Sequence, residues 1–362
     1  MIYLDNNATT RVADEVIAAM SPYYTAVYGN AHAAHLFGRR AHDAVEAARV
    51  EVAALVGAET EEIVFTSCGT EGNALVIRGL IDAPHQRTKI VTTAVEHPSV
   101  LSLLQALEAR GLIELAVVSV DGTGAIDLDA MRAAIDNRTL LVTVMLAQNE
   151  TGVIHPIAEI AEMAHARGAL LHVDAVQACG KIPVDVRALD ADFLTISGHK
   201  FHAPKGVGAL AIRSGQKLTP LWYGGGQELG LRSGTEPVPS IVGTGVAARL
   251  AREHLGDFVR VRNLRDRFES SLSGAAIHGA SQPRLPNTSS VTFHGIDASQ
   301  VLHALDEAEI CVSGGGACFS GRTEPTATMR AMGKPAAIRF SMSRFTTEDE
   351  VDATLRVLDR LR

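Results

Sequence analysis

The sequence predicts an α/β fold in which helices flank a mainly parallel sheet. Short apolar runs alternate with longer amphipathic stretches along the chain, and this alternation is typical of strands and helices that follow one another around such a sheet. Polar residues or glycine follow nearly every apolar run. Because open sheets of this kind bind their ligands beyond the carboxyl ends of the strands, the same pattern predicts where the functional site lies.

The first two thirds of the chain contain six strand candidates and four helical patterns. The strand candidates are 62–66, 89–93, 141–146, 169–174, 192–197 and 207–212. The helical patterns are 38–56, 72–80, 98–110 and 156–167. We therefore expect one large domain over residues 15–250.

The remainder of the chain predicts a smaller α+β domain. A long helical pattern runs from Pro239 to about Leu272. Beyond it are strand candidates at 289–293 and 337–342 and helical patterns at 298–308 and 347–361. We expect residues 251–362, joined by residues 1–14, to form this domain.

Composition excludes several classes of function. The chain has 362 residues and a formal net charge of −8, which argues against direct binding of nucleic acid. No apolar run reaches the roughly 20 residues of a membrane helix, and the first ten residues do not resemble a signal peptide. The four cysteines show no CxxC pairing, so we expect neither disulfides nor a metal site, and a cytoplasmic location. His32 and His35 form an HxxH spacing that we interpret as loop residues.

Lys200 is the first candidate for chemistry, since it ends the segment SGHK (197–200) directly after an apolar strand candidate. A lysine there would be partly desolvated, and desolvation lowers the pKa of an amine and makes it nucleophilic toward an aldehyde. A lone lysine at a strand end is more often an ordinary surface residue. The neighbouring segments instead favour an anchor for the aldehyde cofactor pyridoxal 5′-phosphate (PLP).

Asp174 ends the apolar run ALLHVD (169–174). A buried carboxylate needs a partner, and the protonated ring nitrogen of PLP is such a partner. A helix N-cap is the alternative role for Asp174. Gln177, three residues further on, can donate to the phenolic oxygen of the cofactor.

A phosphate cradle is predicted where Gly69 and Thr70 follow one strand candidate and precede a helix. Backbone N–H groups at a helix N-terminus bind phosphate, and Ser197 and His199 can add donors. A GxxxxGK[ST] loop is absent, so nucleotide hydrolysis has no support. His97 follows another strand candidate, where it can stack on a flat ring and transfer protons, although a lone histidine is more often structural.

Eight segments together carry a resemblance that covers nearly the whole chain in order. They are YLDNNATT (3–10), FTSCGTEGN (65–73), VEHPSV (95–100), QNETGVIHPI (148–157), HVDAVQACGKIPVD (172–185), SGHKFHAPKGVGAL (197–210), GGGQELGLRSGTEPV (224–238) and IRFSMSRFTTEDE (338–350). The sequence resembles the NifS/IscS-type cysteine desulfurases of the class V aminotransferase group, which are fold-type I PLP enzymes. The resemblance implies a seven-stranded, mainly parallel sheet and a small α+β domain.

The resemblance also implies roles for residues at matching positions. The cofactor contacts would be Gly69, Thr70, His97, Asn149, Asp174, Gln177, Ser197, His199, Lys200 and Thr235. Lys200 matches the Schiff-base lysine, and Thr235 matches a threonine that reaches the phosphate of the other subunit of a homodimer. The substrate contacts would be Asn7, Asn149 and Arg339. Arg339 matches the arginine that forks onto the α-carboxylate of the substrate, a role that lysine could not fill.

Cys318 distinguishes a desulfurase from other PLP enzymes. Three glycines precede it and one follows shortly after, in VSGGGACFSG (312–321), which suits a flexible loop of the small domain. The resemblance implies that this thiolate takes sulfur from L-cysteine as a persulfide, leaves L-alanine, and passes the sulfur to an acceptor protein. The catalytic set would then be Lys200, His97 and Cys318. A lone cysteine is otherwise more often a small apolar residue in a turn.

Two other classes of function stay open at this point. One is a different PLP reaction, such as that of an aminotransferase or of a selenocysteine or cysteine lyase. The other is a binding paralogue of the sulfur pathway without turnover. The acceptor is equally open among iron–sulfur cluster assembly, thiolation of RNA or cofactors, and DNA sulfur modification. The sequence departs from the resembled pattern at Ala31, Cys68, Gln148 and Leu229.

Overall fold

The large domain is built on a seven-stranded sheet. A computed structural model describes residues 1–84, 86–314 and 324–361 of the chain. In pairing order the strands are β2 (Ile63–Thr66), β8 (Gly208–Ile212), β7 (Phe193–Ser197), β6 (Leu170–Asp174), β5 (Thr139–Met145), β3 (Lys89–Thr93) and β4 (Glu114–Val118). Only β8 runs antiparallel to its two neighbours in this sheet. The predicted mainly parallel α/β sheet is confirmed.

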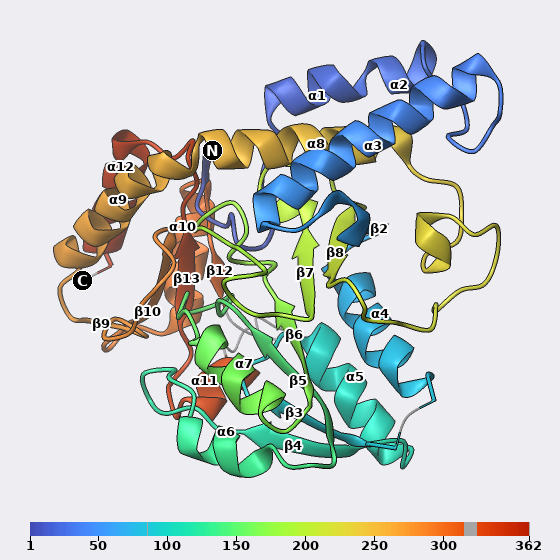
Figure 1. The fold of residues 1–362 in the computed structure, drawn as a ribbon. Helices are drawn as coiled ribbons and strands as arrows, with labels where there is room; N and C mark the ends of the chain where they lie inside the picture. The colour runs from blue at the N-terminus through green and yellow to red at the C-terminus, as the bar shows by residue number, and fades with distance from the viewer. Residues whose placement is uncertain (85, 315–323, 362) are drawn as a thin grey trace.

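Helices cover both faces of this sheet (Figure 1). One core contains side chains from α3 (Leu36–Val56), α6 (Leu128–Ala134), α7 (Ile157–His165) and α8 (Val238–Glu253). The core on the other face contains side chains from α4 (Gly69–Ile81) and α5 (Pro98–Ala109). Successive residues of β2 alternate between the two cores, as the pleat of a strand requires. Two short helices, α1 (Asp14–Met20) and α2 (Pro22–Thr25), pack on α8.

The prediction of one long helix over 239–272 is wrong, because the chain forms two helices there. Helix α8 ends at Glu253, a 3₁₀ turn η4 (Leu255–Asp257) follows, and α9 spans Phe258–Ser271. The turn contains Gly256, and glycine is among the weakest helix formers. The break transfers the chain from one core to another, since α8 packs on α3 whereas α9 packs on the small domain's α12.

The small domain is an antiparallel sheet with helices, as predicted. Its strands pair in the order β12 (Ser313–Gly314), β13 (Ile338–Ser341), β10 (Thr288–Phe293) and β9 (Ala275–Ile277). Its helices are α9, α10 (Ala298–Glu307), α11 (Ala327–Ala331) and α12 (Glu348–Asp359). The core contains Phe268, Phe340 and also Leu4, because β1 (Ile2–Tyr3) pairs with β11 (Ile310–Cys311). The exact division at residues 14 and 250 stays a prediction.

The sheet directions bring six strand ends to one edge. Strands β2 to β7 all run the same way, so their carboxyl ends meet, while β8 begins there. Besides η4, the described residues form three other 3₁₀ turns, η1 (Thr60–Glu62), η2 (Gly198–Lys200) and η3 (Glu228–Gly230). Within the described ranges, no helix is long and apolar enough to cross a bilayer.

Candidate active site

A pocket of about 210 Å³ opens at the carboxyl edge of the large sheet. Its lining contains nine of the residues predicted from sequence, namely Gly69, Thr70, His97, Asn149, Asp174, Gln177, Ser197, His199 and Lys200. They are spread over more than 130 positions of the chain, from Gly69 to Lys200. The structure therefore places the predicted cofactor contacts of one chain, apart from Thr235, around a single cavity.

Lys200 ends the turn η2, directly after β7. Its Nζ donates to the carbonyl oxygens of Asn7 at 2.7 Å and Ala8 at 2.8 Å. Burial lowers the pKa of the Lys200 amine to about 8, and the nearby charge of Arg339 acts in the same direction. The predicted desolvation of this amine is therefore present, and a substantial fraction of it is neutral near physiological pH.

Asp174 lies in the pocket with a hydrogen bond to each of its carboxylate oxygens. Asn73 Nδ2 donates to Oδ2 at 2.8 Å, and the backbone N–H of Val176 donates to Oδ1 at 3.0 Å. Carboxylate oxygens accept more than one hydrogen bond each, so Asp174 keeps capacity for a cationic partner in the pocket. The bond from Val176 is the kind of contact that an N-cap residue makes, which was the alternative role for Asp174. However, no helix follows Asp174.

His97 caps the N-terminus of α5 and lines the same pocket. Its Nδ1 lies 2.8 Å from Ser99 Oγ and accepts from the Ser99 backbone N–H at 3.1 Å. Partial burial lowers the pKa of the His97 imidazole, against the opposing effect of the Asp174 carboxylate. Next to it, burial raises the pKa of Glu96 to about 8. His97 therefore presents a neutral ring to the pocket.

The start of α4 has the features of an anion cradle. A Cβ on Gly69 would lie 2.8 Å from Cγ2 of Val176, so only glycine lets the chain approach this closely. Ser197 Oγ is buried and has no hydrogen-bond partner among the described residues. His199 Nδ1 contacts Thr9 Oγ1 at 3.1 Å, and burial lowers the pKa of His199 to about 4. An unpaired hydroxyl beside helix N–H groups suits a phosphate.

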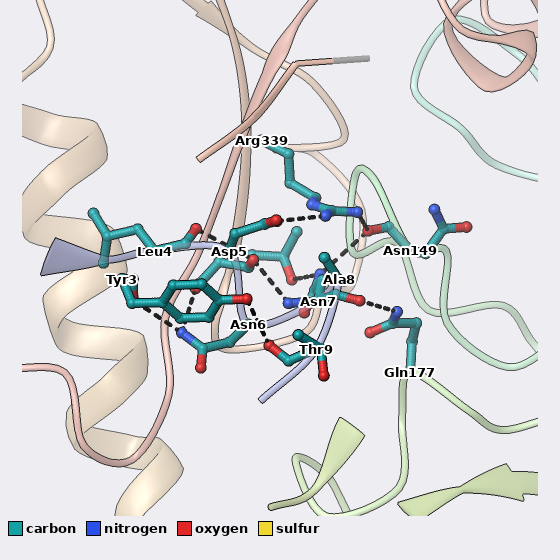
Figure 2. Close-up of polar contacts among 12 residues, drawn as sticks. Tyr3, Leu4, Asp5, Asn6, Asn7, Ala8, Thr9, Asn149, Gln177 and Arg339 are labelled. Carbon is teal, nitrogen blue, oxygen red and sulfur yellow. Dashed lines mark hydrogen bonds and ion pairs between the residues drawn. The ribbon is translucent and has the colours of Figure 1, made fainter. Parts of the chain in front are cut away.

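Arg339 reaches the edge of the pocket from β13 and is held by two oxygens (Figure 2). Its Nη2 donates to Asp5 Oδ1 at 2.7 Å, and its Nη1 donates to the carbonyl oxygen of Asn149 at 3.0 Å. Its Nε is buried without a partner in the described structure. The guanidinium thus has a fixed orientation and spare donors, which is what a bidentate contact with a carboxylate requires.

Asn7 lies beside the pocket with its side chain committed to protein atoms. Its Nδ2 donates to Thr288 Oγ1 at 2.9 Å and to the Asn149 carbonyl at 3.2 Å, and its Oδ1 accepts from Asn287 and Lys181. Its main-chain carbonyl oxygen accepts hydrogen bonds from Lys200 Nζ and Gln177 Nε2. Asn7 supports the pocket through its main chain, and a side-chain contact with substrate stays a prediction.

Comparison with known proteins identifies the family. The aminotransferase class-V family model matches residues 2–354. The chain belongs to the aminotransferase class-V family. It is 47% identical to a cysteine desulfurase of Trichormus azollae, over 100% of this chain and 92% of the relative. It is also 46% identical to a cysteine desulfurase of Gluconacetobacter diazotrophicus, over 99% and 92%. The resemblance seen in the sequence is confirmed, and the chain is grouped with the cysteine desulfurases.

Solved structures with a similar fold also include a NifS-like protein and a cysteine complex. A NifS-like protein superposes with a TM-score of 0.93 at 37% identity, over 99% of this chain and 98% of that one. A structure of SspA in complex with cysteine superposes with a TM-score of 0.85 at 31% identity, over 96% and 100%. The fold prediction is thereby confirmed beyond the sheet order alone.

Besides Asn7 and Arg339, two further predicted residues of this class-V enzyme do not line the pocket as described. Thr235 is exposed between η3 and α8 and does not line it. Cys318 lies outside the described residues. Of the other cysteines, Cys68 lines the pocket and Cys179 is buried, and burial raises the pKa of the Cys179 thiol to about 12. Cys179 is therefore unsuited to act as a thiolate.

The departures from the family pattern have distinct surroundings. Gln148 is buried, donates to Thr328 Oγ1 at 2.9 Å, and accepts from two backbone N–H groups of its own turn. Ala31 is buried in the core to which α3 also contributes side chains. Leu229 is 71% exposed and has a left-handed φ of 58°, so it displays an apolar side chain on the surface. His32 pairs with Glu236 at 2.6 Å, and no cluster of potential metal ligands is found in the described ranges.

Sequence reasoning missed several residues that shape the site. They are Asp5 against Arg339, Asn73 against Asp174, and Lys181 against Asn7 and Gln177. Asp5 stands in the motif YLDNNATT, whose conspicuous residues were the asparagines and threonines. A signal for it was available, because a carboxylate in a buried strand-like segment calls for a cationic partner.

Proposed function

We propose that this cysteine desulfurase binds PLP at Lys200 and transfers the sulfur of L-cysteine to Cys318 as a persulfide. The observation that carries the proposal is the coexistence, in one pocket, of a lysine with a lowered pKa, a carboxylate with spare acceptor capacity and an anion cradle. These three features match the aldehyde, the ring nitrogen and the phosphate of PLP. No single one of them would be specific alone.

The residues present fit the cofactor. Ser197 Oγ, unpaired in the described structure, and the backbone at Gly69 would bind the phosphate, with Thr70 and His199 beside them. Asp174 would pair with the ring nitrogen, and His97 would stack on the ring. When bound, PLP supplies an electron sink for the electron pairs released at the α-carbon of an amino acid.

Lys200 would also move the protons of the reaction. Its Nζ can accept a proton in its neutral form and return it, and a pKa near 8 suits both directions at physiological pH. Arg339 would bind the α-carboxylate with its remaining donors, and Asn149 lies beside it. The substrate's Cα–H bond would then be held within reach of Lys200. The Nζ of Lys200 would give up its hydrogen bonds to the carbonyl oxygens of Asn7 and Ala8 in order to react.

Cys318 would carry out the sulfur transfer. Its thiolate attacks the Sγ of L-cysteine, an S–S bond forms, and the Cβ–S bond breaks with its electron pair left on carbon. Protonation of that carbon gives L-alanine, and Cys318 retains the sulfur. An acceptor protein then takes the sulfur, for iron–sulfur cluster assembly or another sulfur pathway, in the cytoplasm.

We further propose that the enzyme is a homodimer in which Thr235 of one subunit reaches the phosphate of the other. Thr235 is exposed and lies apart from the pocket of its own chain. The same loop exposes three large apolar side chains, Trp222, Tyr223 and Leu229. Burial of these side chains against a second copy would be favourable.

The products of L-cysteine test this function. The purified protein with PLP and a reductant is expected to release alanine and sulfide in equal amounts. Incubation with L-cysteine and an α-keto acid is the matched control for an aminotransferase. Amino transfer to the keto acid without sulfide would contradict the proposal, as would a protein that binds L-cysteine without turnover.

The substitution Arg339→Lys is expected to raise KM for L-cysteine by about tenfold to a hundredfold, because charge-assisted hydrogen bonds contribute roughly 1.5–3 kcal/mol. Lysine keeps the charge but loses the forked geometry and the contacts with Asp5 and Asn149. Steady-state kinetics measures the effect. Arg356→Lys, on the exposed side of α12, serves as the control, and equal KM values in both variants would contradict the role.

Capture of PLP by the cofactor-free protein is expected to accelerate as pH rises, with a midpoint near 8. The attacking amine must be neutral, so the rate is low below the pKa of Lys200 and levels off above it. Stopped-flow absorbance between pH 6 and 10 measures the profile. A lysine peptide, whose amine has a pKa of about 10.4, provides the reference, and a midpoint at that value for the protein would contradict the effect of burial.

A further inference from the structure

A second lysine, Lys181, is buried behind the pocket and has no place in the mechanism above. It is 4% exposed and does not line the cavity. It follows Gly180, whose φ is +76° and where an added Cβ would lie 2.7 Å from Cβ of Phe201. This close contact between the turn and η2 fixes the position of Lys181 beneath the N-terminal segment.

Lys181 is held by neutral oxygens rather than by a carboxylate. Its Nζ donates to Gln177 Oε1 at 2.7 Å and to Asn7 Oδ1 at 3.0 Å. No acidic side chain in the described structure forms a salt bridge with it. Burial, and then the charges of Lys200 and Arg339, lowers the pKa of Lys181 well below its ordinary value. The two acceptors of this amine are therefore both side-chain amide oxygens.

These contacts determine which way the Gln177 amide faces. Because its oxygen accepts from Lys181, its nitrogen is turned toward the Asn7 carbonyl, to which it donates at 2.9 Å (Figure 2). One N–H of that nitrogen remains for the pocket that Gln177 lines. The same Asn7 carbonyl receives Lys200 at 2.7 Å. Lys181 thus holds the side chains of Gln177 and Asn7, and the main-chain carbonyl of Asn7 accepts from the reactive amine.

We propose that Lys181 is a positioning residue that keeps the amide nitrogen of Gln177 directed at the phenolic oxygen of PLP. The inference rests on the proposed function, because it needs the cofactor in this pocket. A buried amine needs hydrogen-bond acceptors, and the amide oxygens of Gln177 and Asn7 supply them. The amine orients an amide that could otherwise exchange its oxygen and nitrogen.

Spectroscopy of the bound cofactor tests this role. An N–H donated to the phenolic oxygen favours the form with more negative charge on that oxygen. Loss of the donor is therefore expected to raise the pH midpoint of the visible absorbance change. In Lys181→Met we expect a rise of about one pH unit, which is a tenfold change in proton affinity. Lys181→Gln, which keeps a polar group in the core, should shift the midpoint in the same direction by less.

A double-mutant cycle separates positioning from simple stability. If Lys181 acts through Gln177, the variant with both Lys181→Met and Gln177→Met should show the midpoint of Gln177→Met alone. The surface substitution Lys217→Met should leave the midpoint unchanged. Additive shifts, or a lower Tm in Lys181→Met with an unmoved midpoint, would overturn the inference. A wild-type protein without any cofactor absorbance would instead refute the proposed function itself.

Discussion

Replacement of Lys200 by alanine is expected to reduce alanine formation from L-cysteine by roughly a thousandfold or more, since the amine both anchors the cofactor and transfers protons. The pocket should otherwise remain, because the hydrogen bonds of the Lys200 side chain within the described structure go to the carbonyl oxygens of Asn7 and Ala8. PLP should still bind through the cradle and Asp174, but reversibly. Turnover assays and gel filtration of the cofactor-loaded variant measure the two effects separately.

The controls for Lys200 distinguish its chemistry from its charge. Lys200→Arg keeps a cation but cannot provide a neutral amine at physiological pH, so it should be as inactive as the alanine variant. Lys217→Ala, on the surface, should retain full activity. An arginine variant with more than a few per cent of wild-type turnover would show that Lys200 is not the reacting amine.

Replacement of Cys318 by alanine is expected to abolish sulfur transfer while the cofactor site stays intact. The proposed reaction requires a thiolate that attacks the substrate's Sγ, and of the three described cysteines Cys68 alone lines the pocket. Burial raises the pKa of the Cys179 thiol to about 12, and Cys311 belongs to β11, which pairs with the N-terminal strand β1. The rate of alanine formation should fall at least a hundredfold, with an unchanged visible spectrum.

Cys311→Ala provides the matched control, because it removes a free thiol of the small domain that does not line the pocket. It should keep wild-type turnover. A Cys318→Ala variant with full release of sulfide would mean that sulfur leaves without a persulfide on this residue, as in a lyase. The two substitutions therefore separate the desulfurase from its closest alternative within the same cofactor chemistry.

Much of the fold followed from the sequence because the sheet is buried on both faces. Such strands are continuous apolar runs, and six of the seven were found in this way. The seventh, β4, is one of the two edge strands of this sheet and is only partly buried, and it was not among the candidates. The break between α8 and α9 was missed because both halves have helical periodicity. Only the division between two cores shows why the chain turns at Gly256.

The site was predictable where local sequence dictates position. Residues that follow strands, such as Asp174 and Lys200, gather at one edge whatever the details of packing. The supporting residues were not predictable in this way. Asp5 meets Arg339 across 334 positions of sequence, and Lys181 meets Asn7 across 174. Contacts of that kind depend on the path of the N-terminal segment between the two domains. A local sequence pattern does not predict that path.

The most direct test of the central claim is the state of Cys318 after one turnover. The cofactor-loaded protein is mixed with one equivalent of L-cysteine without reductant, then digested and analysed by mass spectrometry, while alanine is measured in the same sample. We expect the peptide containing Cys318 to be heavier by one sulfur atom, with one alanine formed per modified chain. Stoichiometric alanine with an unmodified Cys318 peptide and free sulfide would contradict the account.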